Sequence, residues 1–260
     1  MNLCRLRFPC TFENREAVGE GLSTLATFLS RNGQILGPDY DYLTGCSGSE
    51  MVLTCRLPIA ESLDEKHRSD YVRSKWVEVE ELCGAKASLE VGPTVAPAFL
   101  SDLSNPPVLL LGGRRDSALN TLEGEIGVPL FLLPWHADLR EGLYGFHREY
   151  CLLSKLEADC GSLEFESYRE LAEPFSRLNL RGRSWARNVE KTQDTPVYYL
   201  LVRHYGYENE EPICPGCGQN LLAREGERTF LCEPCRLATT RPGDRGDDYR
   251  AYLGTWGGFP

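Results

Sequence analysis

The stretch Cys214-Pro-Gly-Cys217-Gly, followed by Cys232-Glu-Pro-Cys235, carries the strongest chemical signal in the chain. The two Cys-x-x-Cys motifs are separated by 14 residues, 218–231. This spacing is typical of a zinc ribbon, in which each motif turns tightly and directs its two sulfurs at one ion. The prolines and glycines in and beside the motifs favour such turns. We therefore predict that these four cysteines bind one Zn²⁺.

The predicted metal ion has a structural role. Four thiolates complete the tetrahedral coordination of zinc and leave no open position for water or substrate. The residues between the motifs predict a β-hairpin, with Leu221–Ala223 and Thr229–Leu231 as its strands. A two-stranded hairpin is marginally stable in water, whereas zinc binding supplies on the order of 10–16 kcal/mol of folding free energy. The alternative is four free or disulfide-bonded cysteines without a metal.

The composition is that of an ordinary globular protein. The chain has 260 residues, of which 42% are hydrophobic and 25% charged, which is enough to bury a sizeable core. The N-terminus has no apolar segment typical of a signal peptide, and the longest apolar runs are too short to span a bilayer. Eleven cysteines, seven of them scattered outside the motifs, fit a reducing compartment. We expect a cytoplasmic protein without membrane contact.

The hydrophobic pattern predicts an α+β protein with an N-terminal β-α-β-β-α-β order, which is that of a ferredoxin-like sandwich. Within this part, Ser62-Leu-Asp-Glu65 has the spacing of a capping box and predicts the start of the second helix. Residues 128–133 predict a short strand. The best helical pattern of the chain runs from Asp138 to about Cys160. We expect four segments: a sandwich over 1–107, a mixed helical region with short strands over 108–207, the zinc ribbon over 208–241 and a tail over 242–260.

A local basic face stands out in an acidic chain, whose net charge is −10. The helix predicted from Arg177 to Thr192 places Arg183, Arg187 and Lys191 at positions i, i+4 and i+8, which share one face. These side chains are candidates for contacts with the phosphates of a nucleic acid. The predicted ribbon adds three further candidates, Arg224, Arg228 and Arg236.

Several blocks of the sequence resemble a bacterial family of uncharacterised proteins described as containing a zinc ribbon and proposed to bind nucleic acid. The ribbon, with Cys235-Arg-Leu237 after its last ligand, is the most specific part of this resemblance. The family often carries a further Cys-x-x-Cys before the Val-Pro-Leu, where this chain has Thr121-Leu-Glu-Gly124. The matching blocks are Ser62–Val72, Val128–Leu130 with Pro134, Gly182–Glu190, Thr195–Leu200, Ile213–Cys217 and Cys232–Leu237.

Three classes of function remain open from the sequence. The first is a zinc-ribbon protein that binds RNA or single-stranded DNA through the basic face. The second is an acidic interaction or regulatory protein, whose charge steers it to a basic protein partner and whose zinc is purely structural. The third is an enzyme, for which the sequence offers no nucleophile elbow, Walker motif or dinucleotide fingerprint. Four histidines, at positions 67, 136, 147 and 204, leave a Cys–His pair open.

Overall fold

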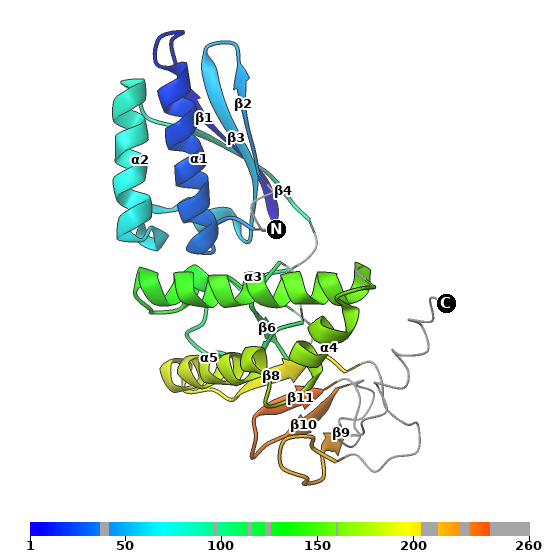
Figure 1. The fold of residues 1–260 in the computed structure, drawn as a ribbon. Helices are drawn as coiled ribbons and strands as arrows, with labels where there is room; N and C mark the ends of the chain where they lie inside the picture. The colour runs from blue at the N-terminus through cyan, green and yellow to red at the C-terminus, as the bar shows by residue number, and fades with distance from the viewer. Residues whose placement is uncertain are drawn as a thin grey trace. The chain divides into compact units, whose positions relative to one another are not determined.

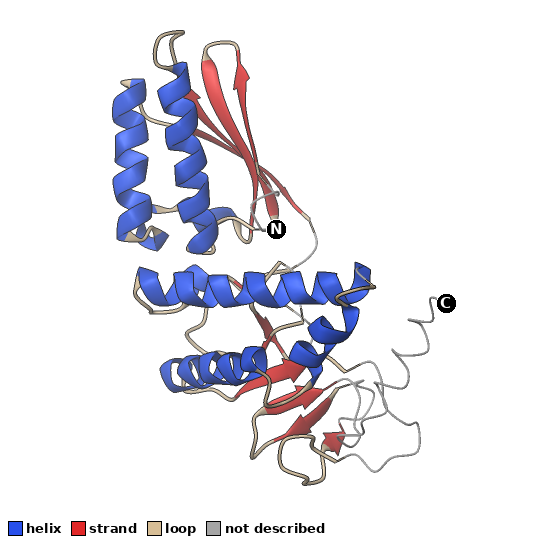
Figure 2. Cartoon of the chain, viewed as in Figure 1, coloured by secondary structure: helices blue, strands red, loops and turns tan. Residues whose placement is uncertain are grey.

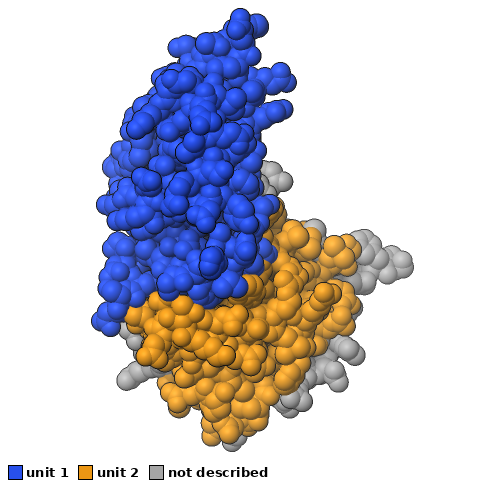
Figure 3. All heavy atoms as spheres, turned by 90° about the vertical axis from the view of Figure 1, so that its left-hand side faces the viewer, with its two compact units in different colours: residues 1–105, 115–145 blue, residues 106–114, 146–260 orange. Residues whose placement is uncertain are grey.

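The computed structural model describes residues 1–36, 42–95, 98–113, 116–122, 126–159, 161–203, 213–223 and 229–239. The chain forms two compact units (Figure 3). The first comprises residues 1–105 and 115–145, and the second comprises residues 106–114 and 146–260. Both contain helices and strands, so the protein is a mixed α+β protein (Figure 2). Within the described residues, no helix is both long and apolar enough to cross a membrane.

The first unit is built around a four-stranded sheet with the strand order β2-β3-β1-β4, in which all neighbouring strands are antiparallel. Helices α1 and α2 lie on one face of this sheet (Figure 1). In chain order the elements are β1 (Asn2–Pro9), α1 (Arg15–Arg31), β2 (Leu43–Ser47), β3 (Glu50–Leu57), α2 (Asp70–Cys83) and β4 (Ser88–Thr94).

The alternation of apolar and polar residues in β1 explains the two faces of this sheet. Cys4, Leu6 and Phe8 are buried against the helices, whereas Arg5 and Arg7 lie on the opposite face. Successive side chains of a strand point to opposite faces, so a single strand supplies both surfaces. The core is completed by apolar residues of α1, β3 and α2, among them Leu22, Leu25, Leu53, Leu57, Val72 and Trp76.

The predicted start of the second helix is wrong. Ser62 does not open an α-helix, because its hydroxyl bonds locally to the amide and carbonyl of Ile59, within a short 3₁₀ turn. The helix begins at Asp70 instead, and Ser69 caps it by accepting a hydrogen bond from the amide of Val72 at 3.3 Å. Ser69 rather than Ser62 therefore marks the start of the helix.

Residues 115–145 add a small antiparallel pair to the first unit, β6 (Leu119–Thr121) with β7 (Gly127–Val128). The strand predicted over 128–133 ends at Val128, because Pro129 follows and residues 130–132 form a 3₁₀ turn. The helix α3 (Ala137–Asp159) confirms the long predicted helix, and it begins in the first unit and ends in the second.

The second unit contains a sheet in which β5, β8 and β11 are parallel, and β10 and β9 extend it in antiparallel fashion. Strand β11, from the predicted ribbon, pairs directly with β8, from the predicted middle region. The boundaries predicted at residues 107, 207 and 241 stay predictions. The elements are β5 (Leu109–Leu111), α4 (Glu164–Ala172), α5 (Arg177–Gln193), β8 (Val197–Leu201), β9 (Leu222–Ala223), β10 (Phe230–Cys232) and β11 (Leu237–Thr239).

Helix α5 packs closely on β8 through a glycine. A Cβ atom at Gly182 would clash with Cε2 and Cζ of Tyr199 and lie 2.8 Å from Cζ of Phe146. The hydroxyl of Tyr199 donates a hydrogen bond of 2.7 Å to Oδ1 of Asn179, and all of Tyr199 is buried. This buried contact fixes the helix against the strand that pairs with β11.

Candidate metal centre

The side chains of Cys214, Cys217, Cys232 and Cys235 converge, with their sulfur atoms all within 4.8 Å of one another. The Sγ atoms of Cys217 and Cys232 are 3.6 Å apart. Zinc–sulfur bonds of about 2.3 Å in tetrahedral geometry place the sulfurs of a site about 3.8 Å apart. The cluster therefore has the size and the donor atoms to hold a metal ion, as the spacing of the two motifs predicts.

The first knuckle, Cys214–Gly218, is a tight turn stabilised by backbone amides. The amide of Gly218 donates to the carbonyl of Cys214 at 2.8 Å, and the amide of Gly216 points at the sulfur of Cys214 at 3.3 Å. A Cβ atom at Gly216 would lie 3.0 Å from Cδ1 of Leu237 and 3.4 Å from the sulfur of Cys235. The glycine thus lets the two knuckles approach each other.

The second knuckle lies in the turn between β10 and β11, which are antiparallel with Cys232 opposite Leu237. The residue after its last cysteine, Arg236, has φ = 52°, and the residue in the equivalent position of the first knuckle, Gly218, has φ = 75°. A left-handed conformation favours glycine, so an arginine at this position needs compensating contacts.

Arg236 receives these contacts from α5 and β8. Its Nε lies 3.2 Å from Oε1 of Glu190, and its guanidinium carbon lies 5.6 Å from the ring centroid of Tyr198. Its carbonyl accepts a hydrogen bond from the amide of Tyr199. The other carboxylate oxygen of Glu190 accepts from the amide of Val197. The knuckle is thereby tied to α5 and to the first residue of β8.

The thiols differ in their exposure to water. Cys214 and Cys232 are buried, whereas Cys217 is exposed. Burial raises the pKa of the Cys232 thiol, and it raises the pKa of Cys235 to about 11. Without a cation these two groups hold their protons at neutral pH. A bound divalent ion favours the thiolates and releases those protons.

The predicted basic residues fall into three groups. Arg187 and Lys191 are exposed on α5, and Arg183 is half-buried beside them. Arg236 is held by Glu190 at the metal centre. Arg224 and Arg228 lie outside the described residues.

The histidines gave no prediction of a site, yet one of them lies beside a cysteine. The sulfur of Cys151 is 3.6 Å from Nε2 of His147, four residues earlier on α3. His147 is buried, as expected for a histidine packed on the apolar side of this helix. The i, i+4 spacing on one helix face was the signal available in the sequence. The ten cysteines in the described part of the chain are all free thiols.

Comparison with known proteins finds relatives without an assigned function. A family model described as "Domain of unknown function (DUF2310)" matches residues 114–202, which include α3, α4, α5 and β8 and end before Cys214. A protein of Haemophilus influenzae named "Uncharacterized protein" is 26% identical over 224 residues, covering 80% of this chain and 85% of the relative. A second of the same name and organism is 28% identical over 130 residues, covering 47% of this chain and 64% of the relative.

One solved structure is also similar, described as "Structure of Rv0793 from Mycobacterium tuberculosis". It is 21% identical, with a TM-score of 0.28, and the match covers 37% of this chain and 97% of that chain. A TM-score at this level supports no conclusion about fold or function. The chain is therefore similar to uncharacterised bacterial proteins, in part through a domain family of unknown function.

Proposed function

We propose that the four cysteines bind one structural Zn²⁺, and that the metal centre holds the C-terminal strands on the sheet of the second unit. The convergence of the four sulfurs supports this proposal most strongly. A site of four thiolates favours zinc among the common divalent ions, and it leaves no position for catalytic water. The free thiols elsewhere in the described part of the chain support a reducing compartment such as the cytoplasm.

For the N-terminal part we propose a ferredoxin-like sandwich. Its support is the order of elements from β1 to β4 and the antiparallel strand order β2-β3-β1-β4, with both helices on one face. Such a scaffold hosts many unrelated functions, so it assigns no activity by itself.

We further propose that the exposed basic side of α5 binds RNA or single-stranded DNA. Among the described residues, no carboxylate forms an ion pair with Arg183, Arg187 or Lys191. In contrast, Arg181 on the same helix is paired with Glu149 at 2.6 Å. Unpaired cations are free to contact phosphates and to release counterions. The link between Arg236 and Glu190 places this helix in the same unit as the metal centre.

A salt series with the zinc-loaded protein tests the proposed binding. Affinity for generic RNA and single-stranded DNA should fall steeply with salt, because each phosphate contact releases counterions. Arg187→Gln should weaken binding, and the slope of log affinity against log salt concentration should become shallower by about one unit, which corresponds to the loss of one phosphate contact. Arg181→Gln is the matched control, since Glu149 already neutralises its charge. It should leave the slope unchanged.

Two results would contradict the nucleic-acid proposal. The first is an absence of binding even at low salt, and the second is an equal effect of the two substitutions. Either would favour the alternative in which a basic protein partner associates with this chain of net charge −10. The zinc proposal would be unaffected, because it rests on the sulfur cluster alone.

A further inference from the structure

The face of the first unit's sheet that α1 and α2 leave bare carries a groove of about 340 Å³. Its lining combines two arginines with hydroxyl groups and apolar side chains. Ligand sites in proteins begin at about 300 Å³, so the groove suits a small molecule. The lining residues are Arg5, Arg7, Leu43, Thr44, Gly45, Cys46, Ser47, Val52 and Thr54.

Strand register explains why a hollow forms here. Gly45 lies opposite Val52, and Val52 lies opposite Arg7, so these residues form one row across the sheet. In the neighbouring row, Leu43 lies opposite Thr54. Gly45 contributes no side chain to its row, and a Cβ atom there would meet nothing within 4 Å. The missing side chain at Gly45 therefore leaves a depression in the sheet surface beside the apolar side chain of Val52, and the longer side chains of the neighbouring rows form its walls.

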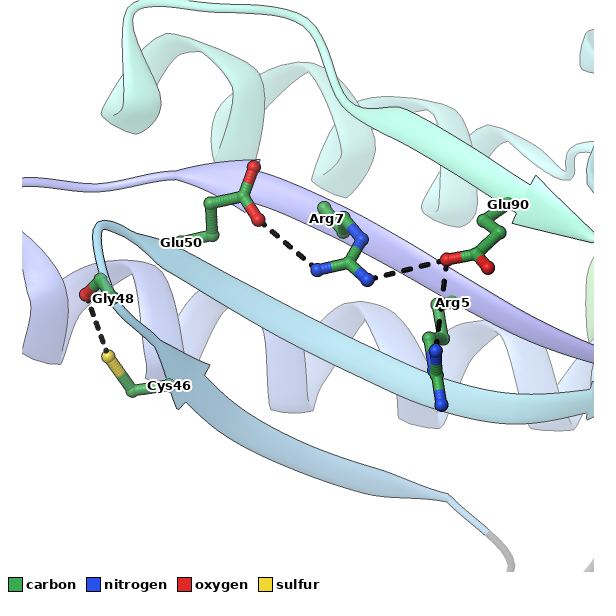
Figure 4. A network of polar contacts seen from close by, with 6 residues as sticks. All are labelled: Arg5, Arg7, Cys46, Gly48, Glu50 and Glu90. Atoms are coloured by element: carbon green, nitrogen blue, oxygen red, sulfur yellow. Dashed lines mark hydrogen bonds and ion pairs between the residues drawn. The ribbon is translucent and has the colours of Figure 1, made fainter.

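Arg7 is held in place by two carboxylates (Figure 4). Its Nη1 donates to Glu50 at 3.2 Å and its Nη2 donates to Glu90 at 3.3 Å. Neither glutamate belongs to the lining of the groove. The two carboxylates thus fix the guanidinium from its sides and leave further N–H donors for another acceptor.

Arg5 makes fewer polar contacts with neighbouring side chains than Arg7 does. It lies opposite Thr54 on one side and opposite Glu90 on the other. Its Nη1 is 3.9 Å from Glu90, which is too long for a hydrogen bond, and its side chain is 49% exposed. No described residue accepts a hydrogen bond from it. A guanidinium at the rim of a groove with unused donors is a ready partner for a carboxylate.

We propose that this groove binds a small organic carboxylate, with Arg5 and Arg7 holding the carboxylate and an aliphatic part lying over Val52 and Leu43. The hydroxyl groups of Thr54 and Ser47 provide additional polar contacts at the edge. Glu50 and Glu90 offset the charges of the two arginines, so the head group is selected by their remaining N–H donors, which match the two oxygens of a carboxylate. The apolar floor selects a ligand with a hydrocarbon part over a bare inorganic anion. The site is independent of the metal centre, because all its residues belong to the first unit.

Octanoate is the probe for this site, and octanamide is its uncharged counterpart. Titration of the full chain is followed by calorimetry and by backbone amide shifts of β1, β2 and β3. The wild-type protein should bind octanoate saturably, and Arg5→Gln should weaken binding about tenfold or more. Arg56→Gln is the matched control, since Arg56 is an exposed arginine of β3 outside the groove. It should leave the affinity unchanged.

Two further measurements separate the groove from a general charge effect. Gly45→Val fills the low floor without changing charge, so it should abolish octanoate binding while the unfolding midpoint is retained. Val52 and Thr54 share their face of the sheet with Arg5 and Arg7, so octanoate should shift the backbone amides of these two residues. Octanamide should shift them little.

Several outcomes would overturn the proposal. These are no saturable binding of octanoate to the wild-type chain, equal losses in Arg5→Gln and Arg56→Gln, or octanamide binding as tightly as octanoate.

Discussion

At the scale of single residues, Gly182 is the position where the packing of α5 leaves least room. A methyl group there would clash with the ring of Tyr199 and crowd Phe146. Gly182→Ala should therefore destabilise the protein by about 1–3 kcal/mol, despite the better helix propensity of alanine. Chemical denaturation monitored by circular dichroism measures this change.

A second helical glycine provides the control. Gly145 on α3 is exposed, and a Cβ atom there meets nothing within 4 Å. Gly145→Ala should be stabilising by up to about 1 kcal/mol. Equal and small effects of the two substitutions would contradict the close packing of α5 on β8.

The thiols of the metal centre predict a pH dependence. The raised pKa values of Cys232 and Cys235, the latter about 11, mean that protons compete with the metal at neutral pH. Apparent zinc affinity should rise with pH and fall as pH falls, because metal binding displaces those protons. Competition with a chromophoric chelator between pH 6 and 8 checks this, and a pH-independent affinity would contradict it.

The sequence pattern predicts the cluster of four cysteines, but it does not predict the contacts of Arg236 that hold the second knuckle. The convergence of the four cysteines follows from spacing alone, because two Cys-x-x-Cys motifs are a local pattern. The role of Arg236 does not follow from a local pattern, because its ion pair with Glu190 spans 46 residues of sequence. The positive φ of Arg236 could not be predicted from the sequence either, because arginine rarely adopts that conformation.

At the scale of secondary-structure elements, the metal centre should govern the order of β10 and β11. Cys232 ends β10, and the knuckle that follows leads directly into β11. Removing the metal with a chelator should raise hydrogen exchange in these strands first, and then in β8, whose edge β11 covers. Exchange in β1 and β3 should not change, and unaltered protection of β10 would contradict a structural role for the metal.

The side chain of Ser69 caps the start of α2. Ser69→Ala removes the side-chain acceptor at the start of α2 and should cost about 1 kcal/mol of stability. Ser74→Ala, at an exposed position inside the same helix, should be neutral or slightly stabilising. Urea denaturation compares the two variants. A loss only in Ser74→Ala would argue against the observed helix start.

The misplaced helix start has a plain physical reason. Both Ser62 and Ser69 precede apolar residues at helical spacing, and each makes a favourable local hydrogen bond. Only tertiary packing decides between them: Ser62 is buried, and its carbonyl accepts from Gln34. Long-range contacts of this kind leave no trace in a local sequence pattern.

At the scale of the whole molecule, the sequence predicted the elements better than their assembly. The order of strands and helices in residues 1–95 follows from period and turn residues. The parallel pairing of β8 with β11 joins segments separated by the first knuckle and the hairpin, so no local pattern announces it. The groove on the bare sheet face likewise depends on cross-strand register.

Elemental analysis of the purified protein is the decisive measurement of whether the four cysteines hold one structural zinc ion. The wild-type chain should contain about one zinc per molecule, and Cys232→Ser should lose it. Cys46→Ser, at an exposed cysteine of β2, should keep the full content. A wild-type protein without bound metal, or a Cys232→Ser variant with full zinc content, would mean that these cysteines do not hold a structural zinc ion.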